Sequence, residues 1–389
     1  MSDRLRAVLS EPEAGRFGPE ADLIRATVRS FVATEILPHV DRWEEAGTFP
    51  RELYPRAGDV GILGVGYPED VGGTPTGLWG QIATWEEMAR CTSGGIAASL
   101  GSHHIALPPI VAHGTPEQQA RFVSPVLAGD RIAALAITEP GAGSDVANLM
   151  TRAVRDGDHY LIDGSKTFIT SGVRADQITV AVRTGGPGHD GISLLVVEAD
   201  VDGFTRSGPM AKMGWWPSDT ATLYFDRVRV PVANRVGPEN AGFRIIMENF
   251  QMERLQLAVS GYVTAETAIV EAWRYATDRT VFGRPVAGFQ ANRHRFVDLV
   301  AETTAAKEFT YRAAEGIERG EDRTTEISLA KLLATAAAEH ATYAAVQLFG
   351  GAGYLRGNVA ERLYRDARIL AIGGGTSEIM REIVAKRIL

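Results

Sequence analysis

The sequence predicts an α+β protein in which a helical part, an antiparallel β part and a second helical part follow one another. Apolar residues recur at helical spacing in the first third and again from about residue 238 onward. Between them lie short β-type runs separated by polar turns. We therefore expect an N-terminal helical domain over residues 1–129, a middle β domain over 130–237, and a C-terminal helical bundle over 238–389.

The first third of the chain is expected to form a series of helices. Residues 21–40 carry apolar side chains three and four positions apart, and Pro38 ends this run. Similar runs predict helices over residues 51–59, 78–90 and 115–127, the last with Pro116 in its first turn. Residues 94–104 are small and apolar, which favours close packing of helices.

The middle third is predicted to be an antiparallel barrel or sandwich. Its strand-like runs cover residues 132–138, 152–155, 160–162, 166–170, 177–183, 192–198, 204–207 and 222–228. Turns at residues 156–158 and 163–165 are expected to separate the second, third and fourth runs. Several short strands joined by short polar turns are typical of such β domains.

The last third is again helical, with helices expected over about residues 238–276, 288–319, 323–350, 358–367 and 376–388. The length of 389 residues allows two or three domains and a large core. A hydrophobic content of 45% with 23% charged residues is that of an ordinary globular protein, because membrane and disordered chains depart from such values.

Composition also excludes several classes of function. A formal net charge of −8 argues against nucleic acid as the main partner. No apolar run reaches the roughly 20 residues that a membrane-spanning helix needs. Cys91 is the only cysteine, so no internal disulfide can form, and we expect it in the core. With no signal peptide visible, we expect a cytoplasmic protein.

A metal site is not expected either. His103 and His104 are adjacent, so they point to different faces of a helix, and no cluster of Cys, His or Asp accompanies them.

One carboxylate on the long helix predicted from residue 238 needs an explanation. Glu253 follows Phe250 by three residues and precedes Leu257 by four, so it lies on the inward, apolar face. Burying a carboxylate costs several kcal/mol unless it is paired or its pKa rises. Two interpretations follow: a structural ion pair with an arginine of another helix, or a general base with a raised pKa.

Glycine-rich and arginine-bearing motifs suggest contacts with phosphate or a ring system. They are Thr138–Asp145, Phe168–Gly172, Arg279–Pro285 with Gln290, Gln347–Tyr354, and Gly373–Gly375 before Thr376. Glycines let backbone N–H groups approach an anion, and arginine binds phosphate through its guanidinium. The first motif is not a dinucleotide-binding fingerprint, because its third glycine is missing and strands follow it. Each motif alone fits an ordinary turn or helix cap equally well.

Taken together and in this order, the motifs resemble those of the acyl-CoA dehydrogenase family. The chain shows T-E-P-G-A-G-S-D, F-I-T in place of W-I-T, R-x-x-F-G with a following Q, Q-x-x-G-G-x-G, R-D-A-R and G-T-x-E-I. The resemblance covers nearly the whole chain. It implies an acyl-CoA dehydrogenase fold, non-covalently bound FAD and a homotetramer. It also implies that Arg279, Gln290 and residues 347–351 reach the FAD of a neighbouring subunit.

The resemblance also assigns roles to individual residues. It implies FAD-binding residues at Leu135, Ile137, Thr138, Gly143, Ser144, Phe168, Thr170, Arg279, Phe282, Gln290, Gln347, Gly350, Gly351, Thr376 and Glu378. It implies substrate-binding residues at Ser144, Met252, Arg254, Gly373 and Gly374.

The resemblance further identifies the catalytic base. Many family members carry their catalytic glutamate where this chain has Gly374, which cannot act as a base. A subset similar to the long-chain and isovaleryl enzymes takes it instead from an E-R pair on the long helix, here Glu253-Arg254. Glu253 is therefore expected to remove the α-proton of an acyl thioester, while the Gly374 N–H and the flavin ribityl chain bind the thioester oxygen.

Three functions are consistent with these expectations. The first is α,β-dehydrogenation of an acyl-CoA thioester, with electrons passed to an electron-transferring flavoprotein. The second is the same oxidation of a thioester bound to a carrier protein. The third is a flavoprotein of this fold that no longer dehydrogenates. The missing side chains at Gly373 and Gly374 leave room near the reacting carbons, which favours a branched or long acyl chain unless neighbours fill the gap.

Overall fold

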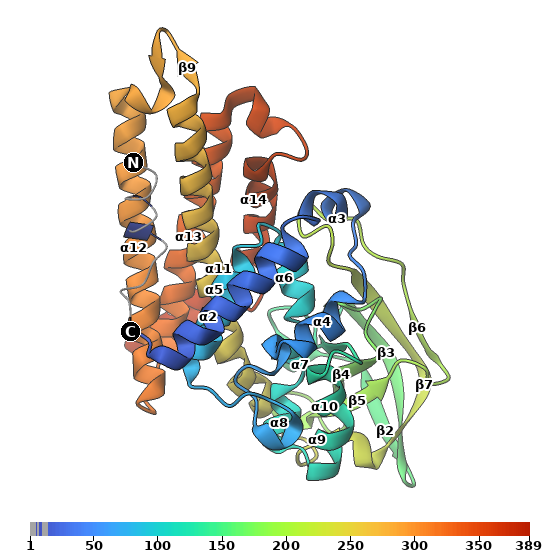
Figure 1. The fold of residues 1–389 in the computed structure, drawn as a ribbon. Coiled ribbons are helices and arrows are strands. Elements are labelled where there is room, and N and C mark those ends of the chain that lie inside the picture. Colours follow the sequence, from blue (N-terminus) through green and yellow to red (C-terminus); the bar gives the residue numbers. More distant parts are fainter. Residues whose placement is uncertain (1–4, 6–7, 10–14) are drawn as a thin grey trace.

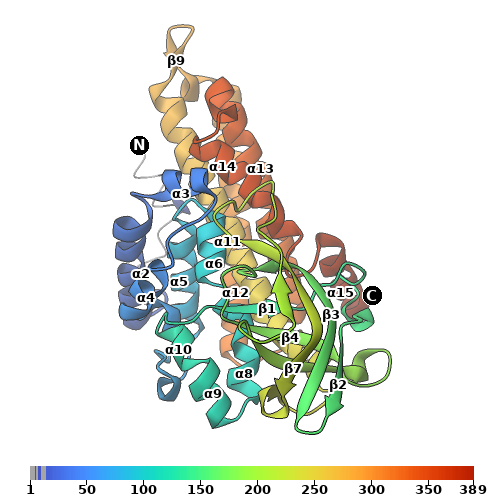
Figure 2. The same cartoon turned by 90° about the vertical axis from the view of Figure 1, so that its right-hand side faces the viewer.

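The computed structural model describes residue 5, residues 8–9 and residues 15–389. Figures 1 and 2 show the chain's middle part as a twisted sheet at the lower right of each view, with the long helices of the last third standing beside and above it. The predicted order of a helical, a β and a second helical part is confirmed.

The N-terminal part contains short helices, several of them ended by glycine or proline. They are α2 (Pro19–Phe31), α3 (Val40–Ala46), α4 (Leu53–Asp59), α5 (Leu78–Ala89), α6 (Gly94–Leu100), α7 (His103–Ala106), α8 (Pro108–His113), α9 (Pro116–Phe122) and α10 (Ser124–Leu127). After α2 the chain continues as a π-helical turn, Val32–Ile36, so the helical run stops just before Pro38. Thr115 and Gln118 form a capping box at the start of α9.

The middle part is one mixed sheet. Its strands are β1 (Ala133–Ala136), β2 (Arg152–Asp156), β3 (His159–Thr170), β4 (Gln177–Arg183), β5 (Ile192–Glu198), β6 (Phe204–Arg206), β7 (Thr220–Pro231) and β8 (Arg235–Val236). The strand order is β6-β7-β3-β2-β4-β5-β8, and β1 pairs with β4. Most pairings are antiparallel as predicted, whereas β1 lies parallel to β4 and β2 touches β4 in one parallel pair.

The turn predicted at residues 163–165 is wrong, because these residues lie inside the long strand β3. Pairing of β3 with β7 shifts register between Ile162 and Gly164, so the glycine marks a β-bulge. Gly164 has φ +143°, and a Cβ there would lie 2.7 Å from Cα of Thr151. The glycine therefore serves the bulge and the close approach of another segment.

The C-terminal part is a bundle of long helices. They are α11 (Gly242–Asp278), α12 (Gln290–Glu318), α13 (Thr324–Phe349), α14 (Val359–Ala367) and α15 (Ser377–Ile388). Figures 1 and 2 show a hairpin of β9 (Thr280–Val281) and β10 (Arg284–Pro285) projecting from one end of the bundle. Gly261 allows α11 to pack closely on α13, since a Cβ there would lie 2.8 Å from the Ala334 carbonyl oxygen.

Clusters of buried apolar side chains lie in all three parts of the chain and connect them. Cys91 is fully buried among apolar side chains, which confirms its expected place in the core. None of the helices that the structure describes combines the length and apolar character needed to cross a membrane.

Candidate active site

A cavity of about 1080 Å³ lies where the three parts of the chain meet. Its walls come from α5, α6 and α7, from β1 and the end of β3, and from α11 and the loop before α15. Twelve of the residues singled out in the sequence line it: Leu135, Ile137, Thr138, Gly143, Ser144, Phe168, Thr170, Glu253, Arg254, Gly373, Gly374 and Thr376. Motifs more than 230 residues apart in the sequence therefore form one site.

The loop after β1 presents its backbone to this cavity. A Cβ at Gly143 would meet no atom within 4 Å, so the space in front of the loop is open. The loop is held from behind by Glu139, which accepts hydrogen bonds from the Met150 and Thr151 N–H groups and from Lys166 Nζ at 2.8 Å. Burial and Glu139 act oppositely on Lys166, whose pKa falls to about 8 because burial dominates.

An aromatic side chain borders the same part of the cavity. Phe168 has φ +58° near the end of β3, and its side chain is 68% exposed. A non-glycine residue with positive φ costs energy, so its retention at a cavity rim points to a function. The open glycine loop and the exposed aromatic fit the flat, polar-edged ring system of a flavin.

The carboxylate of Glu253 has no partner among the described residues. It makes no hydrogen bond to another side chain or backbone group there, and no ion pair within 4.0 Å. The structural ion pair considered from sequence is therefore not formed. Burial raises the pKa of Glu253, while the charges of Lys331 and Arg254 act to lower it. A raised pKa on an unpaired carboxylate in a cavity is a property of general bases.

The glycine loop before α15 lies directly against this carboxylate. Gly374 has φ +63°, a conformation that side chains rarely adopt. A Cβ on Gly374 would lie 3.6 Å from Cδ of Glu253 and only 2.6 Å from Cδ1 of Leu257. A side chain at Gly374 and the carboxylate of Glu253 would thus point into the same part of the cavity.

Two cationic side chains bind the carbonyl groups of the same loop. Arg254 Nε donates to the Gly374 oxygen at 3.2 Å, and Lys331 Nζ donates to the oxygens of Gly373, at 2.6 Å, and Gly375. The sequence interpretation missed Lys331. The available signal was a single lysine within a run of leucine, alanine and threonine on a helix, at a position that faces inward.

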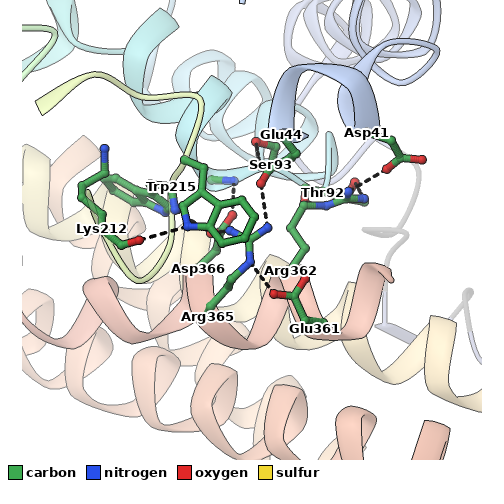
Figure 3. Close-up of polar contacts among 12 residues, drawn as sticks. Asp41, Glu44, Thr92, Ser93, Lys212, Trp215, Glu361, Arg362, Arg365 and Asp366 are labelled. Carbon is green, nitrogen blue, oxygen red and sulfur yellow. Dashed lines mark hydrogen bonds and ion pairs between the residues drawn. The ribbon is translucent and has the colours of Figure 1, made fainter. Parts of the chain in front are cut away.

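A buried polar network forms another part of the cavity wall, and Figure 3 shows it. Arg365 of α14 pairs with Glu44 of α3 at 2.7 Å. Asp366 accepts hydrogen bonds from the backbone N–H groups of Gly94, at 3.0 Å, and Trp215, at 2.6 Å. Burial raises the pKa of Asp366 to about 7, and the neighbouring Glu44 adds to this. The network therefore joins all three parts of the chain beside the cavity.

The remaining singled-out residues do not line the cavity. They are Met252, Arg279, Phe282, Gln290, Gln347, Gly350, Gly351 and Glu378. Arg279, Phe282 and Gln290 lie at or beside the projecting hairpin, where the Phe282 side chain is 95% exposed. Gly350 and Gly351 follow the C-terminal end of α13. No group of three metal-ligating side chains is found within the described part of the chain.

This combination of fold and site defines an enzyme class. The α–β–α architecture, a cavity with an open glycine loop and an unpaired inward carboxylate belong to a flavin-dependent oxidoreductase.

Comparison with known proteins makes the assignment more specific. Models of the N-terminal, middle and C-terminal domains of acyl-CoA dehydrogenase match residues 18–130, 134–228 and 240–389. The chain belongs to the acyl-CoA dehydrogenase family, whose members are FAD-dependent oxidoreductases acting on CH–CH groups. The resemblance seen in the motifs is thereby confirmed.

Three relatives illustrate the likeness. The chain is 37% identical over 377 residues to the long-chain specific acyl-CoA dehydrogenase of Rattus norvegicus, covering 96% of this chain and 87% of that protein. A probable acyl-CoA dehydrogenase from Mycobacterium abscessus has a TM-score of 0.94 and 49% identity, over 95% of this chain and 99% of the other. The prolyl acyl carrier protein oxidase AnaB has a TM-score of 0.89 and 27% identity, over 95% and 99%.

Proposed function

We propose that the protein oxidises an acyl-CoA thioester with a branched or long acyl chain to the trans-2-enoyl-CoA, with Glu253 as the catalytic base. The unpaired carboxylate of Glu253, set against the glycine loop in the cavity, carries this proposal. Electrons then pass to an electron-transferring flavoprotein, and the active form is a homotetramer.

The proton and the hydride leave the substrate from neighbouring carbons. Glu253 takes the α-proton, which the thioester carbonyl acidifies, and the bond electrons form the new double bond. Bound FAD supplies the acceptor for the hydride that departs from the β-carbon. Ser144 and Arg254 line the cavity and contact the bound substrate. The Gly374 N–H stabilises negative charge on the thioester oxygen.

The shape of the cavity supports a long acyl chain. Glu253, Leu257, Ser260 and Thr264 follow one face of α11 and all line the cavity. Thr264 lies eleven positions after Glu253, which is about 16 Å along a helix axis. Beside the reacting carbons, Leu257 fills the room expected at Gly374, whereas the nearest atom to a Cβ at Gly373 is 3.6 Å away. A branch would therefore be accommodated on the Gly373 side.

The singled-out residues outside the cavity are assigned to contacts between subunits and to the outer part of the substrate. Arg279, Gln290, Gln347, Gly350 and Gly351 bind the FAD of a neighbouring subunit, and Phe282 and Glu378 also bind FAD. Met252 stays a proposed substrate-binding residue, although its side chain packs against the core of the helical bundle and does not line the cavity. This division is supported by the strong exposure of Phe282 on the hairpin, far from Glu253 along the 37-residue helix α11. We also propose domain boundaries at residues 129/130 and 237/238.

A second candidate is the same oxidation of a thioester on a carrier protein. The similarity to the prolyl acyl carrier protein oxidase supports this second candidate function. The chemistry at Glu253 would be unchanged, and only the recognition of the carrier would differ.

The test is anaerobic flavin bleaching by a panel of thioesters. The panel contains butyryl, isovaleryl, 2-methyl-branched, octanoyl and palmitoyl groups, each on CoA and on a carrier protein. We expect bleaching by CoA thioesters, with kcat/KM higher for branched or long chains by about tenfold or more, since one or two methylenes are worth roughly 1–3 kcal/mol. Bleaching by carrier-bound groups alone would favour the second candidate. No bleaching by any thioester would refute dehydrogenation, and an optimum at butyryl would refute the chain preference.

A further inference from the structure

Lys331 is a buried cation at the rear of the glycine loop. It lies on α13, and it is 1% exposed. Its ammonium group donates to the carbonyl oxygens of Gly373 and Gly375, the residues on either side of Gly374. Arg254 of α11 holds the oxygen between them. Three consecutive carbonyl groups of the loop are therefore each bound by a cationic side chain.

Fixing a carbonyl also fixes the next N–H group. A trans peptide is planar, so its C=O and its N–H point in opposite directions. The Gly373 carbonyl and the Gly374 N–H belong to one such plane, and Lys331 holds the carbonyl at 2.6 Å. Within the described part of the chain the Gly374 N–H donates to no other group. Among the described residues, the one other hydrogen bond of Gly373 to Gly375 joins the Gly373 N–H to the Ile369 oxygen at 2.9 Å, and the glycines have no side chains that could hold the loop.

Lys331 also acts on the carboxylate. Its charge and that of Arg254 are the two that lower the pKa of Glu253 against the effect of burial. The pKa of Lys331 itself falls to about 8, because burial outweighs the attraction of Glu253, and Arg254 lowers it further. Other titratable or charged groups that line the cavity are His103, His104, Asp145, His189, Lys212, Arg365, Asp366, Arg368, Glu382 and Lys386.

We propose that Lys331 is a positioning residue for the reaction: it holds the glycine loop so that the Gly374 N–H faces the thioester oxygen, beside the Glu253 carboxylate. This inference rests on the proposed function. It assigns a task to a lysine that touches neither substrate nor cofactor, and it explains why an ammonium is buried beside a backbone loop despite its desolvation cost.

The test compares variants of the FAD-loaded protein. Lys331→Met removes the charge and both hydrogen bonds, and Lys331→Arg keeps the charge with a different geometry. Lys307→Met is the matched control, because Lys307 is a buried lysine of α12 that pairs with Glu266 at 2.8 Å instead of the loop. For each variant we measure flavin content, kcat, KM and the pH at which activity rises through the pKa of Glu253.

We expect Lys331→Met to bind FAD and substrate within a few-fold of the parent but to lose roughly 10²-fold in kcat, as when an oxyanion donor is lost. Its activity should rise only at higher pH, since loss of the cation leaves burial to raise the Glu253 pKa further. Lys331→Arg should gain activity over the same pH range as the parent, with an intermediate kcat. This rise of activity through the pKa of Glu253 is called the pH limb below. Lys307→Met should lose stability without moving the limb.

An unchanged kcat and pH limb in Lys331→Met would overturn the inference. Should that variant not fold, Lys331→Gln decides by the same limb, because it keeps a donor but no charge: a shift supports the inference and its absence overturns it. The proposed function is judged separately, by turnover of the parent and its loss in Glu253→Gln. A parent that turns over while the Lys331 variants behave like it refutes the positioning role alone.

Discussion

Moving the base from α11 to the glycine loop is the most direct test of the active-site geometry. The perturbation is Gly374→Glu, introduced alone and then together with Glu253→Gln and Leu257→Ala. The Cβ of the new side chain would lie 3.6 Å from the Glu253 carboxyl carbon. Rotation of the new side chain would therefore bring its carboxylate to the same region of the cavity.

The cost of the single substitution can be estimated from three contributions. The positive φ of Gly374 costs a side chain about 1–2 kcal/mol. The 2.6 Å approach to Leu257 forces that side chain to move, at roughly 1–3 kcal/mol. Two carboxylates about 4 Å apart repel by about 4 kcal/mol at an effective dielectric constant of 20. That repulsion corresponds to about three pKa units, so the pair should hold a proton at neutral pH.

These magnitudes give a definite order of activities. Gly374→Glu alone should lose most activity at neutral pH and recover part of it at alkaline pH, as the shared proton is released. Gly374→Ala, the control for strain without charge, should show a smaller loss and no shift. Glu253→Gln with Leu257→Ala should lie about 10²–10⁴-fold below the parent. Adding Gly374→Glu to that pair should restore at least tenfold, since a base returns without a like charge beside it.

The assay is single-turnover anaerobic bleaching of the flavin, measured against pH with one saturating acyl thioester. It isolates the chemical step from product release. The reasoning is refuted if the triple variant is no faster than Glu253→Gln with Leu257→Ala while it retains FAD and binds substrate. An identical pH limb for the parent and Gly374→Glu would contradict the calculated repulsion.

Other perturbations test separate parts of the molecule. Acid precipitation should release yellow FAD into the supernatant, and flavin retained in the pellet would indicate a covalent link instead. Glu253→Gln should retain flavin but lose dehydrogenation by about 10²–10⁴-fold or more; near-parental turnover would reject the base. Arg279→Ala should reduce FAD occupancy and oligomer size on gel filtration, whereas its hairpin neighbour Arg284→Ala, whose guanidinium packs on a ring, should not. Arg365→Met should destabilise the protein by about 3–5 kcal/mol in urea unfolding, because it leaves Glu44 unpaired. The exposed Arg368→Met should cost at most about 1 kcal/mol.

Activity should also fall in acid. Burial raises the folded-state pKa of Glu253, so the carboxylate takes a proton at a higher pH than an ordinary glutamate does. Because a protonated carboxyl cannot accept the α-proton, kcat/KM should drop as the pH falls through that raised pKa. A profile whose acid limb lies at the ordinary glutamate pKa, about 4.3, would contradict this.

Local periodicity was enough to predict most elements. The five C-terminal helices lie within a few residues of their expected bounds, since apolar spacing and glycine or proline at the ends specify them. The same reasoning failed at Gly164, because glycine marks both turns and bulges and only the pairing of β3 with β7 distinguishes them. The parallel pairing of β1 with β4 could not be predicted from sequence either, since strand neighbours depend on the path of the intervening chain.

The site was predictable wherever a motif is continuous in the sequence. The motif Thr138–Asp145 and the loop at Gly374 could be singled out, and the structure brings Thr138, Gly143 to Asp145 and the glycine loop to one cavity. Lys331 could not be placed from sequence, because it is 42 residues from Gly373 and its hydrogen bonds are made only when α13 packs beside the loop. The filling of space by Leu257 likewise depends on side-chain packing between two elements.

The identities of residues 253 and 374 are physically linked. A side chain on Gly374 and the carboxylate of Glu253 would compete for one space, as the 3.6 Å separation shows. If both positions carried a carboxylate, the two would repel each other. If neither position carried one, the reaction would have no base. A glutamate is therefore expected at one position and a small neutral residue at the other. Because Leu257 already occupies part of the freed volume, the exchange moves the base to a new direction of approach rather than simply enlarging the pocket.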